Sequence, residues 1–146
     1  MFEHILIPVD GSAPSLHAAD RGAAVAKAFG SKVTVISVID PYPFTGVSGE
    51  IPYSQAEYLE SARADAEKAC KDACQRLSDA GVTAESRVIE SHTTWRGVLD
   101  AAGSAKADLI VMGSHGRHGI ERLVMGSVTQ RVLQHANVPM LIVRGE

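Results

Sequence analysis

The sequence has no long apolar run and no excess of basic residues, and each absence excludes a class of protein. No apolar stretch approaches the roughly 18 residues that a membrane-spanning helix requires. The 14 lysine and arginine residues are outnumbered by 17 aspartate and glutamate residues, so no overall basic field attracts nucleic acid. We therefore expect neither membrane insertion nor a nucleic-acid partner, and any anion site must arise from local residues.

Cysteine is also scarce, and the N-terminal residues lack a secretion signal. Cys70 and Cys74 stand four residues apart in a stretch with helical periodicity, a spacing that suits one helix face and is poor for a disulfide. Reduced thiols that pack in the interior are therefore the simpler interpretation. The opening MFEHILIPVDGS has no basic region, no longer apolar segment and no small-residue cleavage site. Together these features predict a cytoplasmic protein.

What the sequence does contain is a regular alternation of strand and helix signals. Short apolar or β-branched runs predict strands at 4–9, 32–39, 82–90, 108–112 and 139–143. Helical spacing of apolar residues predicts helices at 13–29, 55–80, 94–102 and 128–135. Ser12 is expected to cap the first helix and Gly30 to end it. This alternation predicts an α/β fold with a doubly wound parallel sheet, helices on both faces and one domain over 1–146.

In sheets of this kind, ligands bind beyond the carboxyl ends of the strands, where the strand order reverses. Three loops follow such strand ends in this chain, and they begin at Asp10, Asp40 and Gly113. The loop 40–53 carries three prolines and two glycines. A loop of this length is either a lid or binding segment or a solvated connector, and the sequence leaves both interpretations open.

The segment 113–127, GSHGRHGIERLVMGS, is the strongest functional signal because it places four glycines directly after an apolar strand. Bare backbone amides in a tight turn, followed by a helix N-terminus, form a cradle for an anion. Arg117, His118 and Arg122 add positive charge to this cradle. A simple turn needs only one or two glycines, so the pattern favours phosphate binding. The P-loop and dinucleotide-binding motifs are both absent.

The spacing Gly113-x2-Gly116-x9-Gly126-Ser127 resembles the G-2x-G-9x-G-[ST] signature of nucleotide-binding universal stress proteins. The resemblance spans essentially the whole chain. ILIPVDGS is similar to the first strand and acidic turn of that family, residues 38–40 to the end of its second strand, and VPMLIVR to its last strand. With this resemblance we expect a five-stranded sheet in the order 3-2-1-4-5.

The resemblance implies a site for ATP or a related adenine nucleotide, with Mg²⁺ or Mn²⁺ bridging the phosphates. It places Asp10 near the nucleoside and the backbone of Val38 against the adenine. The full set of expected nucleotide-binding residues is Pro8, Val9, Asp10, Val38, Met112, Gly113, Ser114, Gly116, Arg117, Gly126, Ser127 and Val128. The resemblance also implies a homodimer joined through strand 139–143, which would cover an otherwise unpaired sheet edge.

Catalytic groups are much less evident than binding groups. Phosphoryl transfer needs a positioned nucleophile and charge neutralisation, and no carboxylate pair is dedicated to a metal. His115 and His118 can in principle serve as acid–base groups, but loop histidines are more often solvated. Three interpretations follow: an ATP-binding regulatory stress-response module with slow or no hydrolysis, a genuine ATPase or nucleotidyl-transferring enzyme, or an interaction protein with a vestigial loop. The complete motif disfavours the third and the missing base disfavours the second.

Overall fold

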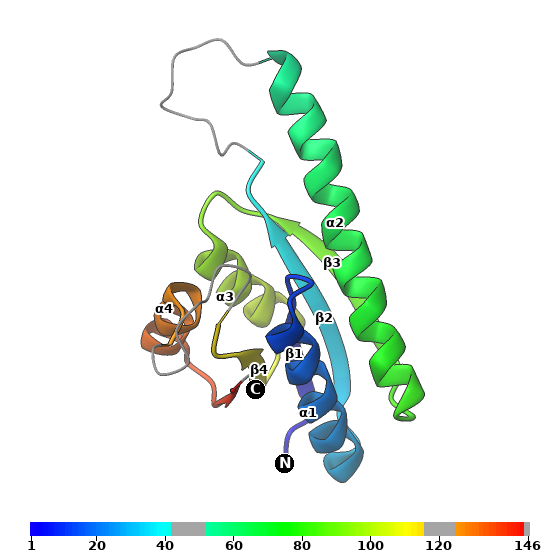
Figure 1. Ribbon diagram of the computed structural model, residues 1–146. Helices are drawn as coiled ribbons and strands as arrows, with labels where there is room; N and C mark the ends of the chain where they lie inside the picture. Colours follow the sequence, from blue (N-terminus) through cyan, green and yellow to red (C-terminus); the bar gives the residue numbers. More distant parts are fainter. Residues whose placement is uncertain (42–51, 116–124, 145–146) are drawn as a thin grey trace.

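The structure, a computed structural model, describes residues 1–41, 52–115 and 125–144. Within these residues strands and helices alternate along the chain (Figure 1). They are β1 (His4–Pro8), α1 (Ala13–Phe29), β2 (Lys32–Ile39), α2 (Pro52–Asp79), β3 (Ala84–Glu90), α3 (Thr94–Ala105), β4 (Leu109–Gly113), α4 (Ser127–His135) and β5 (Met140–Val143).

The strands form one five-stranded parallel sheet in the order β3-β2-β1-β4-β5, which confirms the predicted architecture and strand order. Ile5 of the central strand lies opposite Val33 on one side and Leu109 on the other. The order reverses at β1, because the chain first adds β2 and β3 on one side and later returns to add β4 and β5 on the other. This reversal opens a crevice between the loops that follow β1 and β4.

Each face of the sheet is covered by two helices, so alternate side chains of one strand enter different cores. Ile5 and Ile7 point into the core beneath α1 and α2, whereas Leu6 points into the core beneath α3 and α4. All three side chains are fully buried. The apolar character of the whole HILIP run follows from this arrangement, since a central parallel strand has no solvated face.

Helix α1 approaches the sheet closely because its buried face is built from alanine and glycine. A Cβ on Gly22 would lie 2.5 Å from Cδ1 of Ile7, so no larger residue fits there without movement. The predicted caps are confirmed: the Ser12 hydroxyl accepts a hydrogen bond from the Ser15 amide, and Gly30 ends the helix with a left-handed φ of 65°.

Three helices differ from their predicted ranges, and the smallest difference is that α4 begins at Ser127 rather than at Val128. Helix α2 begins at Pro52, three residues before the predicted start at Gln55, since proline is well tolerated in the first turn of a helix. Helix α3 continues to Ala105 and ends where Lys106 adopts a left-handed φ of 55°. Most of the predicted 40–53 loop, residues 42–51, lies outside the described residues.

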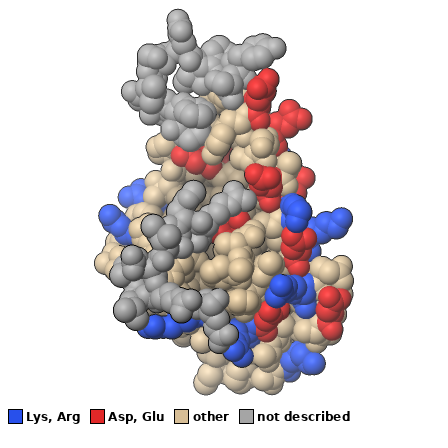
Figure 2. Space-filling model, viewed as in Figure 1, with Lys and Arg blue, Asp and Glu red and all other residues tan. Residues whose placement is uncertain are grey.

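Helix α2 is the longest helix and extends beyond the end of the sheet (Figure 1). Acidic and basic side chains are interspersed along its exposed edge (Figure 2). Two of its ion pairs join Lys68 to Asp72 at 2.8 Å and Arg76 to Asp20 of α1 at 2.7 Å. Across the described segments, no helix combines the length and the apolar character needed to cross a membrane.

Candidate functional site

A cavity of about 410 Å³ lies beyond the carboxyl ends of β1, β2 and β4, at the crevice where the strand order reverses. Every predicted site residue that the structure describes lines this cavity, except Ser114. Gly116 and Arg117 lie outside the described residues. The cavity also includes residues that the sequence prediction of the site did not contain: Ser15, Thr94, Val98, His115 and Thr129.

The turn after β1 holds an acidic side chain at one side of this cavity. The Asp10 carboxylate accepts hydrogen bonds from the Ser12 amide, at 2.9 Å, and from the Ser12 hydroxyl. Gly11 between them has a φ of 84°, a conformation that glycine adopts without steric cost. The Ser15 hydroxyl donates to the Ser12 carbonyl at 2.9 Å. These bonds fix the position of the Asp10 carboxylate before any ligand is present.

On the opposite side, the end of β4 and the start of α4 are joined by backbone contacts. The Gly126 amide donates to the Ser114 carbonyl at 2.6 Å, and the Thr129 hydroxyl donates to the Gly113 carbonyl at 2.8 Å. A Cβ on Gly113 would lie 3.1 Å from the Pro14 carbonyl oxygen, which explains the glycine at this strand end. The first and last parts of the glycine motif are thereby held together.

The N-terminus of α4 supplies the polar end of the cavity. Gly126 is the N-cap residue, and among the described residues no side chain caps the helix. The first intrahelical bond runs from the Gln130 amide to the Gly126 carbonyl at 2.9 Å. The amides of residues 127–129 therefore have no acceptor within the helix, and their partial positive charge favours an anion.

The remaining walls are largely apolar. Val9, Val98 and Met112 are buried and present aliphatic or thioether surface to the cavity. Val38 and Val128 complete this surface. A cavity with apolar walls and one end rich in backbone donors suits a ligand that combines a flat apolar group with an anionic group.

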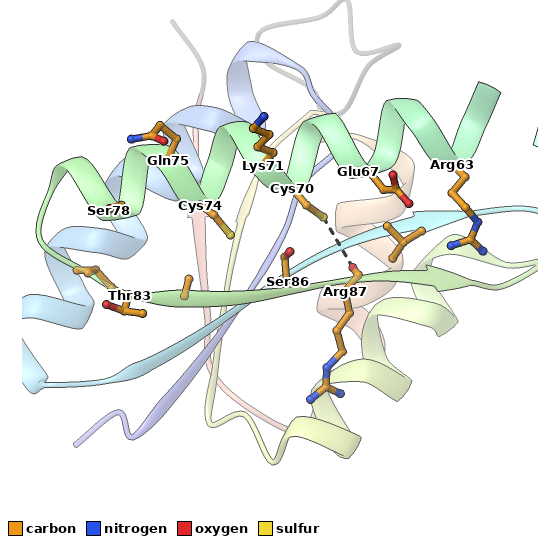
Figure 3. A pocket seen from close by; sticks show the side chains of 13 residues that line it. Arg63, Glu67, Cys70, Lys71, Cys74, Gln75, Ser78, Thr83, Ser86 and Arg87 are labelled. Carbon is orange, nitrogen blue, oxygen red and sulfur yellow. Dashed lines mark hydrogen bonds between the residues drawn. The ribbon is translucent and has the colours of Figure 1, made fainter. Parts of the chain in front are cut away.

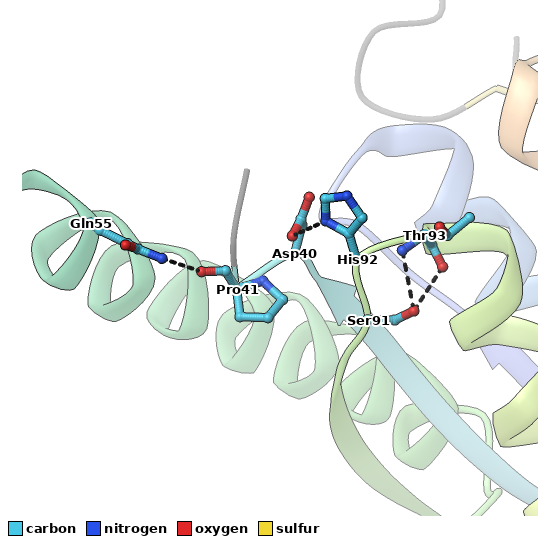
Figure 4. A network of polar contacts seen from close by, with 6 residues as sticks. All are labelled: Asp40, Pro41, Gln55, Ser91, His92 and Thr93. Carbon is cyan, nitrogen blue, oxygen red and sulfur yellow. Dashed lines mark hydrogen bonds and ion pairs between the residues drawn. The ribbon is translucent and has the colours of Figure 1, made fainter. Parts of the chain in front are cut away.

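Polar contacts tie the end of β2 to α2 and to the turn before α3 (Figure 4). The Asp40 carboxylate lies 3.2 Å from Nδ1 of His92, and the Gln55 side chain donates to the Pro41 carbonyl at 3.1 Å. The Ser91 hydroxyl donates to the Thr93 carbonyl at 2.8 Å and orders the turn before α3. Within the described ranges, no group of three or more His, Cys, Asp or Glu residues is arranged to hold a metal ion.

A larger groove of about 720 Å³ lies elsewhere, between α2 and the edge strand β3 (Figure 3). Burial raises the pKa of the Cys70 thiol to about 11, so this group stays protonated and unreactive at neutral pH. Arg87 in this groove is already paired with Glu85 at 3.2 Å. The groove lies on the flank of the sheet rather than at its carboxyl end. The smaller cavity is therefore the better candidate for the functional site despite its size.

Both cysteines, Cys70 and Cys74, are free, in agreement with the prediction.

The sheet order and the cavity at its reversal define an α/β protein of the doubly wound class with a ligand-sized cavity at the switch point. The chain belongs to the universal stress protein family, whose sequence profile matches residues 1–144. A universal stress protein of Methanocaldococcus jannaschii is 34% identical over 144 residues, which cover 99% of this chain and 83% of that protein.

Solved structures show the same fold. The structure of a hypothetical protein, MJ0577, whose biochemical function was assigned from its structure, superposes with a TM-score of 0.83. It is 24% identical, and the match covers 100% of this chain and 98% of that one. A universal stress protein solved in complex with cAMP has a TM-score of 0.75 and is 25% identical, with 99% of each chain covered.

Proposed function

We propose that this universal stress protein binds ATP and acts as a regulatory module in a stress response, with slow or no hydrolysis. The observation that carries the proposal is the uncapped N-terminus of α4, which opens into a cavity lined by both ends of the glycine motif. Three helix amides without intrahelical acceptors form a donor set for phosphate oxygens. The similarity to a protein that was solved with cAMP supports an adenine nucleotide as the ligand.

In the proposed complex, the phosphates lie on residues 126–129 and the adenine lies between the apolar walls near Val38. The Asp10 carboxylate accepts hydrogen bonds from the ribose hydroxyls. The Ser127 hydroxyl adds a donor to the phosphates. Mg²⁺ or Mn²⁺ would be held mainly by the phosphates, because the described residues offer no cluster of metal ligands. The remaining expected residues, Gly116 and Arg117, belong to this proposed site through the sequence motif.

A regulatory role fits the described residues better than an enzymatic one. Hydrolysis requires a group that positions and deprotonates water near the terminal phosphate. The cavity carboxylate, Asp10, already accepts two hydrogen bonds from Ser12, which favours a binding role. We therefore propose that nucleotide occupancy alters the choice of protein partner. The alternative of an ATPase or a nucleotidyl-transferring enzyme predicts rapid turnover.

Calorimetry and thermal unfolding with ATP and Mg²⁺ test this proposal. At 100 times its Kd, ATP should raise the free energy of unfolding by about 2.7 kcal/mol. GTP, which differs from ATP only in its base, serves as the control for recognition of adenine. Absence of both heat of binding and thermal stabilisation by ATP would refute the proposed function. Phosphate release faster than roughly one turnover per second would favour the enzyme.

We also propose that the protein is a homodimer joined through strand 139–143. The sheet order places β5 at an edge, and Leu141 on this strand is 38% exposed. An apolar edge strand left open would pair with other chains. Sedimentation equilibrium should give a dimer for the native chain and a monomer for Leu141→Glu. A monomeric native chain at micromolar concentration would contradict this proposal.

We further propose that residues 1–146 form one nucleotide-binding domain located in the cytoplasm. The two reduced thiols and the continuous sheet support this assignment. Cell fractionation would locate the protein. Its recovery in an extracytoplasmic fraction would contradict the proposed location.

A further inference from the structure

One polar group in the cavity wall is not explained by the fold. His115 follows the end of β4, and its half-buried ring lines the cavity. Its Nδ1 atom lies 3.3 Å from the hydroxyl oxygen of Ser114. Its Nε2 atom is enclosed by protein and has no hydrogen-bond partner; it is the one such side-chain atom among the described residues.

An enclosed ring nitrogen without a partner is unfavourable in either tautomer. A neutral imidazole has one N–H donor and one lone-pair acceptor, so Nε2 leaves either a donor or an acceptor unsatisfied. Buried polar atoms in folded proteins are nearly always paired, and each exception calls for a reason such as strain, a functional role or a bound water or ion. His115 lines the proposed nucleotide cavity, so a ligand in that cavity is the nearest partner that this nitrogen could gain.

The neighbouring serine indicates which kind of ligand group this is. Ser114 is 7% exposed. Its amide donates a hydrogen bond to the Val143 carbonyl, and its carbonyl accepts one from the Gly126 amide, so its backbone is fixed. When its hydroxyl donates to Nδ1, the ring proton resides on Nε2 and that atom becomes a donor. Phosphate oxygens only accept hydrogen bonds. The uncapped amides of α4 line the same cavity and favour an anion there.

We propose that His115 is a phosphate-binding residue that sets the preference of the site for phosphorylated nucleosides. On binding, the ring turns from its enclosed position into the cavity, and Nε2–H donates to a phosphate oxygen. The inference rests on the proposed nucleotide-binding function. It adds the His115 side chain to the site. In the glycine motif this residue occupies a variable position between the first two glycines. Because adenosine has no phosphate, it gains nothing from this contact.

Four variants test the role of His115 by comparing ATP with adenosine. His115→Ala should weaken ATP binding about 10- to 100-fold and change adenosine binding less than about twofold, since a charge-assisted donor is lost. His115→Gln should bind ATP within about threefold of the native chain, because the glutamine amide nitrogen reaches the place of Nε2. His115→Asn should behave like alanine, because its nitrogen corresponds to Nδ1. His17→Ala, in α1 and outside the cavity lining, is the matched control.

A measurement on the unmodified protein covers the case in which a variant fails to fold. In ¹⁵N-detected spectra of the histidine rings, ATP should shift the Nε2 resonance of His115, whereas adenosine should not. Native ATP binding with unchanged affinity in His115→Ala and an unshifted Nε2 resonance would overturn the inference and leave the proposed function intact. Absence of ATP binding by the native chain would overturn both.

Discussion

Helices α1 and α4, two of the helices that begin beside the cavity, differ in how their first amides are satisfied. Helix α1 is capped at its N-terminus. The Ser12 hydroxyl accepts a hydrogen bond from the Ser15 amide, and Pro14 has no amide hydrogen to satisfy. Helix α4 begins after Gly126, which has no side chain, and no other side chain in the described part of the chain caps it. Both helices follow a strand in the same sheet, so their surroundings are similar and the difference lies in the residues at their starts.

This contrast separates a helix start that serves stability from one that serves binding. A capping side chain stabilises a protein by about 1 kcal/mol relative to alanine, but by only a few tenths of a kcal/mol relative to glycine, the N-cap residue of α4. The uncapped amides of α4 are available to an external anion, whereas those of α1 are not. Adding a cap to α4 should therefore raise the free energy of unfolding and weaken ATP binding. Removing the cap of α1 should lower the free energy of unfolding and leave ATP binding nearly unchanged.

The largest effect is expected when α4 is given a cap. Gly126 has φ −61° and ψ 152°, which any residue can adopt, so Gly126→Asp introduces no backbone strain. The new carboxylate should accept hydrogen bonds from the α4 amides and place a negative charge in the cavity. We expect ATP affinity to fall more than roughly 100-fold, while the free energy of unfolding rises by a few tenths of a kcal/mol.

Isothermal titration calorimetry and urea denaturation measure the two quantities for this variant. Gly126→Ala is the control, because it adds a Cβ without a capping oxygen and should lower ATP affinity less than aspartate does. Tight ATP binding by a well-folded Gly126→Asp variant would show that the α4 amides do not contact the phosphates.

A smaller and reciprocal pair of effects is expected for the two serines at these helix starts. Ser127→Ala removes a hydroxyl from the α4 start and should weaken ATP binding by about 1–3 kcal/mol, with stability within about 0.5 kcal/mol of the native chain. Ser12→Ala removes the α1 cap and should lower the free energy of unfolding by about 1 kcal/mol. Its ATP affinity should change little, since the Ser12 amide still donates to the Asp10 carboxylate.

Each serine variant serves as the control for the other. Chemical denaturation gives the free energy of unfolding of each variant, and nucleotide titration gives its ATP affinity. We expect Ser127→Ala to change chiefly the ATP affinity and Ser12→Ala to change chiefly the free energy of unfolding. Equal losses of stability and affinity in both variants would mean that the two helix starts are not functionally distinct.

The sequence predicted the fold well because the relevant signals are local. The run 32–39 is β-branched and continuous, and β2 has the predicted bounds. Ser12 and Gly30 act as the predicted caps of α1 because capping depends on neighbouring residues alone. The start of α2 at Pro52 was predicted less well, since a proline-rich segment can be interpreted as a loop or as a first turn.

The candidate site was predictable only in part. The glycine spacing and the strand ends indicated where an anion could bind, and the described residues of this set lie around one cavity, with Ser114 beside it. Thr94 and Thr129 carry no motif of their own. Their place in the lining depends on where α3 and α4 cross the sheet, which local sequence does not specify. His115 was recognised as a loop histidine, but nothing in its neighbours indicated an enclosed nitrogen without a partner.

The sequence by itself determined the alternation of strands and helices and the glycine-rich break after β4, because hydrophobic periodicity and backbone freedom are properties of short segments. The tertiary structure alone decided that the ends of β1, β2 and β4 converge on one cavity, and that α4 begins there without a cap. The physical reason is that strand order brings together residues about a hundred positions apart, and the donors of a helix terminus acquire a function only when their surroundings leave them unpaired.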